Sequence, residues 1–200
     1  MVKETLNELS QLKKCGFGQP QPRHGLHLLY WFAHECIEFS NNDILCKISP
    51  QRGDFGFHKF LNRIEDDDDN HIVPPHDLPH YEVGNLNAQG ADKLPAYVRA
   101  SKDRDAERNK DRIIVRIDGV DIERVYITEH SDQKRFDNNK TYRVSKGLLQ
   151  IIKNMTREHY VNSVSNQIYY QYTNQSLSRV QSQSHVEPPP PQNDSWCTIL

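Results

Sequence analysis

The chain has 200 residues, which fits one domain and a tail, and its 25 basic and 27 acidic side chains leave a net charge of −2. This near balance argues against a general electrostatic attraction to nucleic acid, although a local basic patch stays open. Hydrophobic residues make up only 36% of the chain, so part of the chain must remain solvated.

The cysteines and the absence of export signals indicate a compartment. Cys15, Cys36, Cys46 and Cys197 show no C-x-x-C spacing, which argues against a zinc site and against a disulfide framework. The N-terminal residues are polar and lack the apolar segment of a signal peptide, and no apolar run is long enough to span a membrane. These features predict a protein of the reducing cytosol.

The first third of the chain predicts two helices and two strands. Apolar residues recur at helical spacing over residues 2–14, and Gly16 ends that helix. Residues 24–39 carry apolar side chains around most of the helix circumference, so we expect this helix to be buried. Alternating apolar residues predict strands at 44–48 and 55–61, with a turn between them.

The middle of the chain predicts a long loop and then a pair of strands. Residues 73–94 are rich in Pro, His, Asn and Gly, which is typical of a loop, and long loops in compact domains are often functional. Residues 102–111 alternate charges of both signs and predict an exposed helix or loop. The β-branched runs 112–118 and 125–128 predict strands, and residues 137–140 predict a turn.

The last predicted helix precedes a change in composition. Residues 141–144 predict a short strand, and Ser145 is a good N-cap for a helix that reaches Met155. After about Val164 the chain is dominated by Gln, Ser, Asn and Tyr, and four prolines follow at 188–191. Few aliphatic side chains remain to be buried, so we expect this segment to be disordered.

Together these elements predict an α+β fold in a single domain, residues 1–164, with antiparallel strands between N- and C-terminal helices. Residues 165–200 form a disordered tail in this prediction. The tail ends in the most specific motif of the chain, a CaaX box made of Cys197, Thr198, Ile199 and Leu200.

The CaaX box predicts lipidation. We expect a prenyltransferase to modify the Cys197 thiol, to recognise the three residues that follow it, and to prefer geranylgeranyl over farnesyl because of Leu200. One lipid gives weak anchoring, and the tail has neither a basic cluster nor a second cysteine. The sequence therefore predicts a cytoplasmic protein that associates reversibly with a membrane surface, aided by an unidentified protein partner and without a cofactor.

Candidate catalytic residues lie near the ends of predicted strands, where scaffolds often hold such groups. His58, Glu129 and His130 are the candidates, since His130 with Glu129 or Glu82 has the chemistry of an acid–base pair. Ordinary strand-end polarity explains the same residues without any function. Aromatic and basic residues also alternate over 55–63, as on surfaces that stack single-stranded nucleic acid, although one face of a sheet gives the same pattern.

No metal site is predicted. Several histidines lie near the acidic run Asp66–Asp69, and these are His58, His71, His76 and His80. Their spacings match no ligand pattern, and consecutive aspartates cannot all face one ion. A solvated acidic loop accounts for this composition.

Five longer motifs resemble a known group of proteins. They are PRHGLHLLYWF at 22–32, GDFGFH at 53–58, LPAYV at 94–98, RVYITEH at 124–130 and TYRVS at 141–145. Over about residues 16–162 the chain is similar to the virus-induced, interferon-responsive antiviral family of bony fish. The resemblance implies an induced cytoplasmic effector of innate immunity, and it implies no catalytic residues.

Three functions stay open at this point. The favoured one is a prenylated, non-enzymatic interaction module at the cytosolic face of a membrane, acting in innate antiviral defence. The second is an enzyme that acts on nucleotides or nucleic acid through His58, Glu129 and His130, which should then share one pocket. The third is a nucleic-acid-binding module, which the balanced charge disfavours.

Overall fold

The computed structural model describes most of the predicted domain. The described residues are 2, 4–15, 24–41, 43–62, 71–99, 111–132 and 135–165. The acidic run Asp66–Asp69, the charged segment 102–110 and the predicted tail from 166 onward lie outside these ranges. No helix within them is long and apolar enough to cross a membrane.

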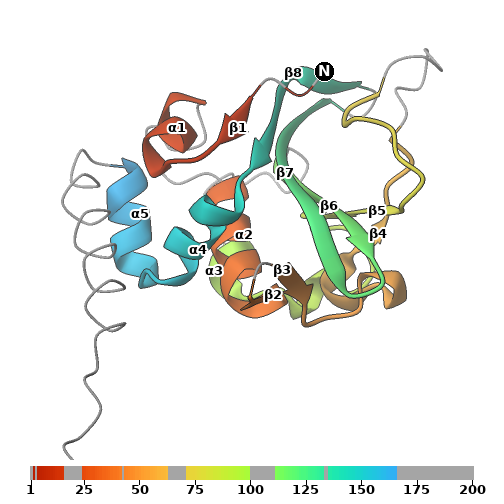
Figure 1. Cartoon of the computed structure of the whole chain (residues 1–200), viewed down its shortest axis with the longest axis horizontal. Helices are drawn as coiled ribbons and strands as arrows, with labels where there is room; N and C mark the ends of the chain where they lie inside the picture. The colour runs from red at the N-terminus through yellow and green to blue at the C-terminus, as the bar shows by residue number, and fades with distance from the viewer. Residues whose placement is uncertain are drawn as a thin grey trace, which may run out of the picture.

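One sheet of eight strands organises the described residues (Figure 1). The strands are β1 (Thr5–Leu6), β2 (Ile37–Ser40), β3 (Asp43–Cys46), β4 (His58–Lys59), β5 (His80–Val83), β6 (Asp111–Asp118), β7 (Asp121–Asp132) and β8 (Arg135–Val144). Their order is β1-β8-β7-β6-β5-β4, while β3 pairs with β7 and β2 pairs with β3. The pairs are antiparallel except β1 with β8. Helices and one mainly antiparallel sheet confirm the α+β class.

The helices lie toward one side of the sheet (Figure 1). They are α1 (Leu9–Lys14), α2 (His24–Trp31), α3 (Ala96–Arg99), α4 (Lys146–Lys153) and α5 (Arg157–Ser165), with a π-helix η1 (Phe32–Cys36) and short 3-10 turns η2 (Pro50–Arg52), η3 (Asp54–Gly56) and η4 (Ala91–Lys93). Helix α2 packs against β6 and β7, and α5 packs against α1 and α2. Six of the eight residues of α2 are buried, as its all-round apolar sequence predicts.

Alternation along β6 divides its side chains between two faces of the sheet. Ile113, Val115 and Ile117 belong to the main core together with the buried residues of α2, and we call this side the helix face. Ile114 points to the opposite side, the second face, where a smaller cluster contains Phe60, Ile72, Val73, Ile114 and Tyr126. Strand β6 is buried on both faces, so it forms the centre of the fold.

The predicted helix over 24–39 is wrong after Cys36. Helix α2 widens into η1, and Ile37–Ser40 leaves the helix as β2 to pair with β3. The Lys153 ammonium group donates hydrogen bonds to the carbonyl oxygens of Ala33 and Ile37, which satisfies acceptors at this helix end. Strand pairing and a cap from a distant helix therefore override the local helical pattern.

Two other predictions change for similar tertiary reasons. The helix expected over 2–14 begins only at Leu9, because Thr5–Leu6 pairs with β8 as a parallel edge strand. The turn expected over 137–140 lies within the span of β8 (Arg135–Val144), at a point where the register with β7 shifts between Thr128 and His130. The strand expected over 55–61 shrinks to His58–Lys59.

The strands and cap predicted from strong local signals are confirmed. Strand β6 covers the predicted 112–118, and β7 contains the predicted 125–128. The Ser145 hydroxyl accepts a hydrogen bond from the Leu148 backbone N–H at 3.1 Å, so Ser145 caps α4. This helix ends at Lys153, and α5 follows at Arg157–Ser165.

Candidate functional site

The structure separates His58 from Glu129, two of the three predicted catalytic residues. His58 is directly opposite Glu82, and Glu82 is opposite Ile114, so His58 and Glu82 share the second face. Glu129 is opposite Asp111, which alternates in phase with Ile113 on the helix face. His58 and Glu129 therefore lie on opposite faces of the sheet and do not form one pocket.

Glu129 and His130 sit at the far end of β7. The Glu129 carboxylate pairs with the Lys140 ammonium at 2.8 Å, which is an ion pair between neighbouring strands. The His130 backbone is opposite Phe136 of β8, and its side chain lies outside the described residues. The predicted pair of His130 with Glu82 therefore also falls outside the described residues, whereas Glu82 itself belongs to a described cluster.

That cluster contains His58, Glu82 and Arg112. The buried carboxylate of Glu82 lies 3.5 Å from His58 Nε2 and 3.4 Å from Arg112 Nε. The hydrogen-bonding interaction with Glu82 raises the pKa of His58 and outweighs the opposing effect of burial. A partly exposed histidine beside a buried carboxylate can exchange a proton with solvent or with a bound group near neutral pH.

We expect Glu82→Gln to lower the pKa of His58 below its usual range, because burial and Arg112 then act without an opposing carboxylate. A histidine whose folded-state pKa is raised stabilises the fold below the unfolded pKa, and this contribution is lost as pH rises through the folded pKa. The contribution is small, since the His58 side chain is 45% exposed. NMR titration of the ring protons checks this, and an unchanged pKa in the variant would mean that Glu82 does not control His58.

The start of α2, which carries the first resemblance motif, is tied to three other segments. His24 is buried, and its Nδ1 and Nε2 lie 3.1 and 3.2 Å from the carbonyl oxygens of Val98 and Gly84. The Gly25 N–H donates to the Asp111 carboxylate at 2.9 Å. An acidic group at a helix N-terminus is favourable. These contacts give His24 a structural role that its position in a motif does not reveal.

A second cluster of charge surrounds the first half of β7. Arg116 and Arg124 are directly opposite each other, and Arg143 of β8 is opposite Tyr126. All three therefore point to the second face of the sheet. Like charges in such positions repel, and burial together with the neighbouring guanidinium groups lowers the pKa of Arg143.

A bulge supplies the one carboxylate that balances this cluster. The register pairs Arg116 with Arg124 and then Ile117 with Ile122, which leaves Glu123 as an extra residue in β7. Its carboxylate pairs with Arg116 Nε at 3.1 Å. Arg124 and Arg143 have no carboxylate within ion-pair distance in the part of the chain that is described.

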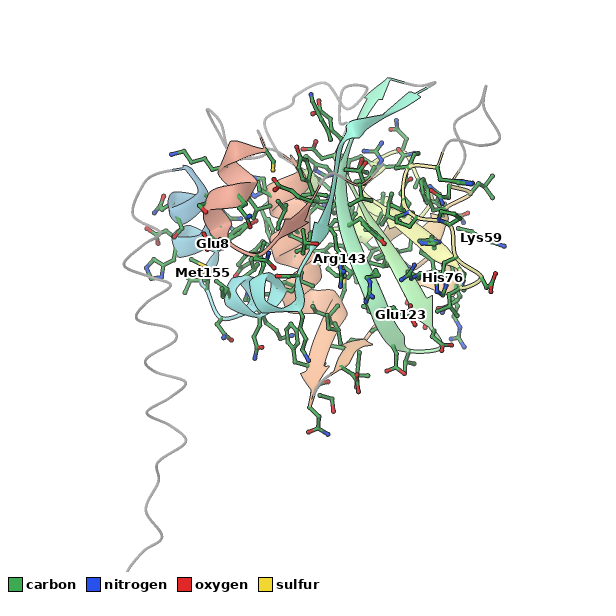
Figure 2. The ribbon with its side chains drawn as sticks, turned by 45° about the horizontal axis from the view of Figure 1, so that its top comes forward. Glu8, Lys59, His76, Glu123, Arg143 and Met155 are labelled. Carbon is green, nitrogen blue, oxygen red and sulfur yellow. The ribbon has the colours of Figure 1, made fainter. Side chains whose placement is uncertain are left out.

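The unpaired arginines line a groove of about 420 Å³. One edge of β7 pairs with β6, and the other edge pairs with β3 at Asp121 and with β8 from Val125 onward. The edge of β7 between Asp121 and Val125 therefore has neither β3 nor β8 beside it and faces the groove. The basic residues of the lining are Arg124, Arg143 and Lys146, and the acidic residues are Asp43, Asp118, Asp121 and Glu123. Figure 2 shows Arg143 and Glu123 on neighbouring strands in the middle of the sheet, with Lys59 at its far edge.

Sequence reasoning did not single out this groove. Its charges come from β3, the turn between β6 and β7, β7 itself, the end of β8 and the start of α4. No contiguous basic run marks it. One feature of the sequence does point to the groove, namely the charge of the strands. In β6, β7 and β8, four arginines alternate with core residues, and these are Arg112, Arg116, Arg124 and Arg143.

Within the described ranges, no group of three or more His, Cys, Asp or Glu side chains is arranged to hold a metal ion. His71 Nδ1 lies 3.0 Å from the Asn62 carbonyl oxygen, and His76 Nδ1 accepts a hydrogen bond from the Leu78 N–H. Both contacts are local. The predicted lipidation site, Cys197 with the three residues after it, lies outside the described residues.

Comparison of the chain with protein-family models, with curated proteins and with solved structures gives no match. The resemblance to interferon-responsive antiviral proteins therefore rests on its five motifs alone.

Proposed function

We propose that the protein is a prenylated interaction module that works at the cytosolic face of a membrane. In this proposal residues 1–164 form one binding domain, and the tail 165–200 carries a geranylgeranyl group on Cys197. The observation that carries the proposal is the CaaX box, with Leu200 as the residue that selects the lipid. The proposal takes Leu200 as the residue with the free carboxylate, which mass spectrometry of the isolated protein can check.

The geometry of the domain supports an interaction module over the predicted enzyme. The enzyme hypothesis requires His58, Glu129 and His130 to act together, and the register places His58 and Glu129 on opposite faces. The domain instead presents a groove with unpaired arginines, which is a feature of binding surfaces. A role in antiviral defence belongs to the proposal through the motif resemblance.

We expect Cys197→Ser to abolish labelling by an alkyne analogue of geranylgeraniol in cells and to move the protein into the cytosolic fraction. The thioether bond forms only at this sulfur, and a single lipid supplies most of the membrane affinity. Because one lipid anchors weakly, we expect the protein with its native sequence to be found in both the membrane and the cytosolic fractions. In-gel detection of the label and fractionation of the same cells measure both effects.

Two matched variants sharpen this experiment. Cys15→Ser removes a half-buried thiol of the domain and should leave labelling unchanged. Leu200→Ser should exchange the geranylgeranyl label for a farnesyl label, since the last residue selects the lipid. Labelling that persists in Cys197→Ser contradicts the proposal. A protein with its native sequence that takes up no label also contradicts it.

A further inference from the structure

Three basic side chains line the groove beside β7. Arg143 comes from the end of β8, Lys146 from the first turn of α4, and Arg124 from β7 itself. The Lys146 ammonium donates to the Asn41 carbonyl oxygen at 3.4 Å, and the Arg124 guanidinium donates to the Glu123 carbonyl oxygen at 2.6 Å. These contacts hold the cations in place without neutralising their charge. The N-terminus of α4 adds its partial positive charge at the same point.

An anion relieves the repulsion among these cations. Guanidinium groups present paired N–H donors that match the oxygens of a phosphate, and charge-assisted hydrogen bonds of this kind are among the strongest in proteins. Arg124 and Arg143 are the two guanidinium groups of the groove, and they come from neighbouring antiparallel strands. A single phosphate is the simplest group that contacts both.

Carboxylates line the same groove. Asp43 comes from β3, and Asp118 and Asp121 flank the turn between β6 and β7. Carboxylates repel a bare phosphate, but they accept hydrogen bonds from hydroxyl groups. The volume of about 420 Å³ lies in the range of small-molecule sites and exceeds what a phosphate group alone fills.

We propose that this groove binds a phosphorylated polyol, with Arg124 and Arg143 on its phosphate and the aspartates accepting hydrogen bonds from its hydroxyl groups. Two sources share this chemistry, the headgroup of a phosphoinositide lipid and a soluble sugar or inositol phosphate. The inference stands on the groove and holds whether or not Cys197 carries a lipid. A headgroup in the groove would supply the second membrane signal that a single prenyl chain requires.

Isothermal titration of the full chain, produced without a prenyl group, tests the inference separately from lipidation. With inositol 1,4,5-trisphosphate as the probe, we expect saturable binding, and Arg143→Gln should lower the affinity at least tenfold. Lys59→Gln removes one charge at the far edge of the sheet and should leave the affinity unchanged (Figure 2). Circular dichroism should show that both variants remain folded.

A change at Asp43 distinguishes a polyol site from a simple anion site. Asp43→Ala removes an acceptor for hydroxyl groups together with a repelling charge, so the affinity for the trisphosphate should fall relative to the affinity for inorganic phosphate. Absence of trisphosphate binding, equal losses in Arg143→Gln and Lys59→Gln, or an equal change in the affinities for both probes in Asp43→Ala overturns the inference.

Vesicle sedimentation then identifies the source of the ligand. Binding to phosphatidylcholine vesicles that contain phosphatidylinositol 4,5-bisphosphate, with loss in Arg143→Gln, assigns the groove to a lipid headgroup. Binding to the soluble trisphosphate without vesicle binding assigns it to a free phosphate. Equal binding to phosphatidylserine vesicles of matched charge indicates charge attraction without a polyol site and overturns the inference.

Discussion

Replacing Gly84 with alanine is expected to destabilise the fold by about 3–5 kcal/mol, since backbone strain and a steric clash act together. Gly84 has a φ of +121°, which L side chains rarely adopt. A Cβ at this position would lie 2.7 Å from Leu28 Cδ2 and 2.8 Å from the Asp111 carbonyl oxygen. The second atom belongs to the backbone of the central strand and cannot move aside. The loss is a large part of the stability of an ordinary domain, and chemical denaturation measures it.

Gly119→Ala is the matched control for this prediction. Gly119 also has a positive φ, +60°, but no heavy atom lies within 4 Å of the point that an alanine Cβ would occupy. The alanine there carries only the backbone penalty of about 1–2 kcal/mol. Equal losses of unfolding free energy in the two variants would show that the close approach of Gly84 to α2 and β6 contributes nothing.

Acidification is expected to remove about 3 kcal/mol of stability through His24 alone. Burial lowers the pKa of this histidine from 6.5 to about 4, and it outweighs the two carbonyl oxygens that favour the protonated ring. Between these values the unfolded chain binds a proton that the folded protein does not. The stability that depends on the neutral His24 ring is therefore intact above pH 6.5. It falls as the pH decreases from 6.5 to 4, and it is fully lost below pH 4.

Unfolding free energies measured from pH 7.5 to pH 4 test this expectation. We expect His24→Gln to be less stable than the unmodified chain at pH 7.5, with the difference narrowing by about 3 kcal/mol at pH 4. His159→Gln makes the same replacement at an exposed position, and its curve should run parallel to that of the unmodified chain. A stability difference for His24→Gln that widens toward pH 4 would mean that the carbonyl oxygens of Val98 and Gly84 control this ring.

These two predictions concern one junction, and it explains why the first resemblance motif contains His24 and Gly25. The junction joins the start of α2 to the loop after β5, to the end of α3 and to the start of β6. A sequence pattern shows that such residues occur together. Only the packing shows that they hold a helix against the central strand.

Local sequence was sufficient where one pattern had no competitor. The β-branched run of β6 favours a strand that is buried on both faces. Ser145 caps α4 through a hydrogen bond to a residue only three positions away. The pattern over 24–39 was insufficient, because Ile37 and Phe39 suit a helix and a strand equally and pairing with β3 decides between them. Residues 138–140 likewise suit a turn, and the register between β7 and β8 shifts at this point of the strand.

The sequence by itself determined the α+β class, the central strands and the proposed lipidation site, because each depends on neighbouring residues in the chain. In the proposal, a prenyltransferase reads four contiguous residues, of which Cys197 is the first. Only the tertiary structure decided that His58 meets Glu82 and that Arg124, Arg143 and Lys146 line one groove. Those side chains are brought together by cross-strand register and by the bulge at Glu123, and register depends on which strands pair.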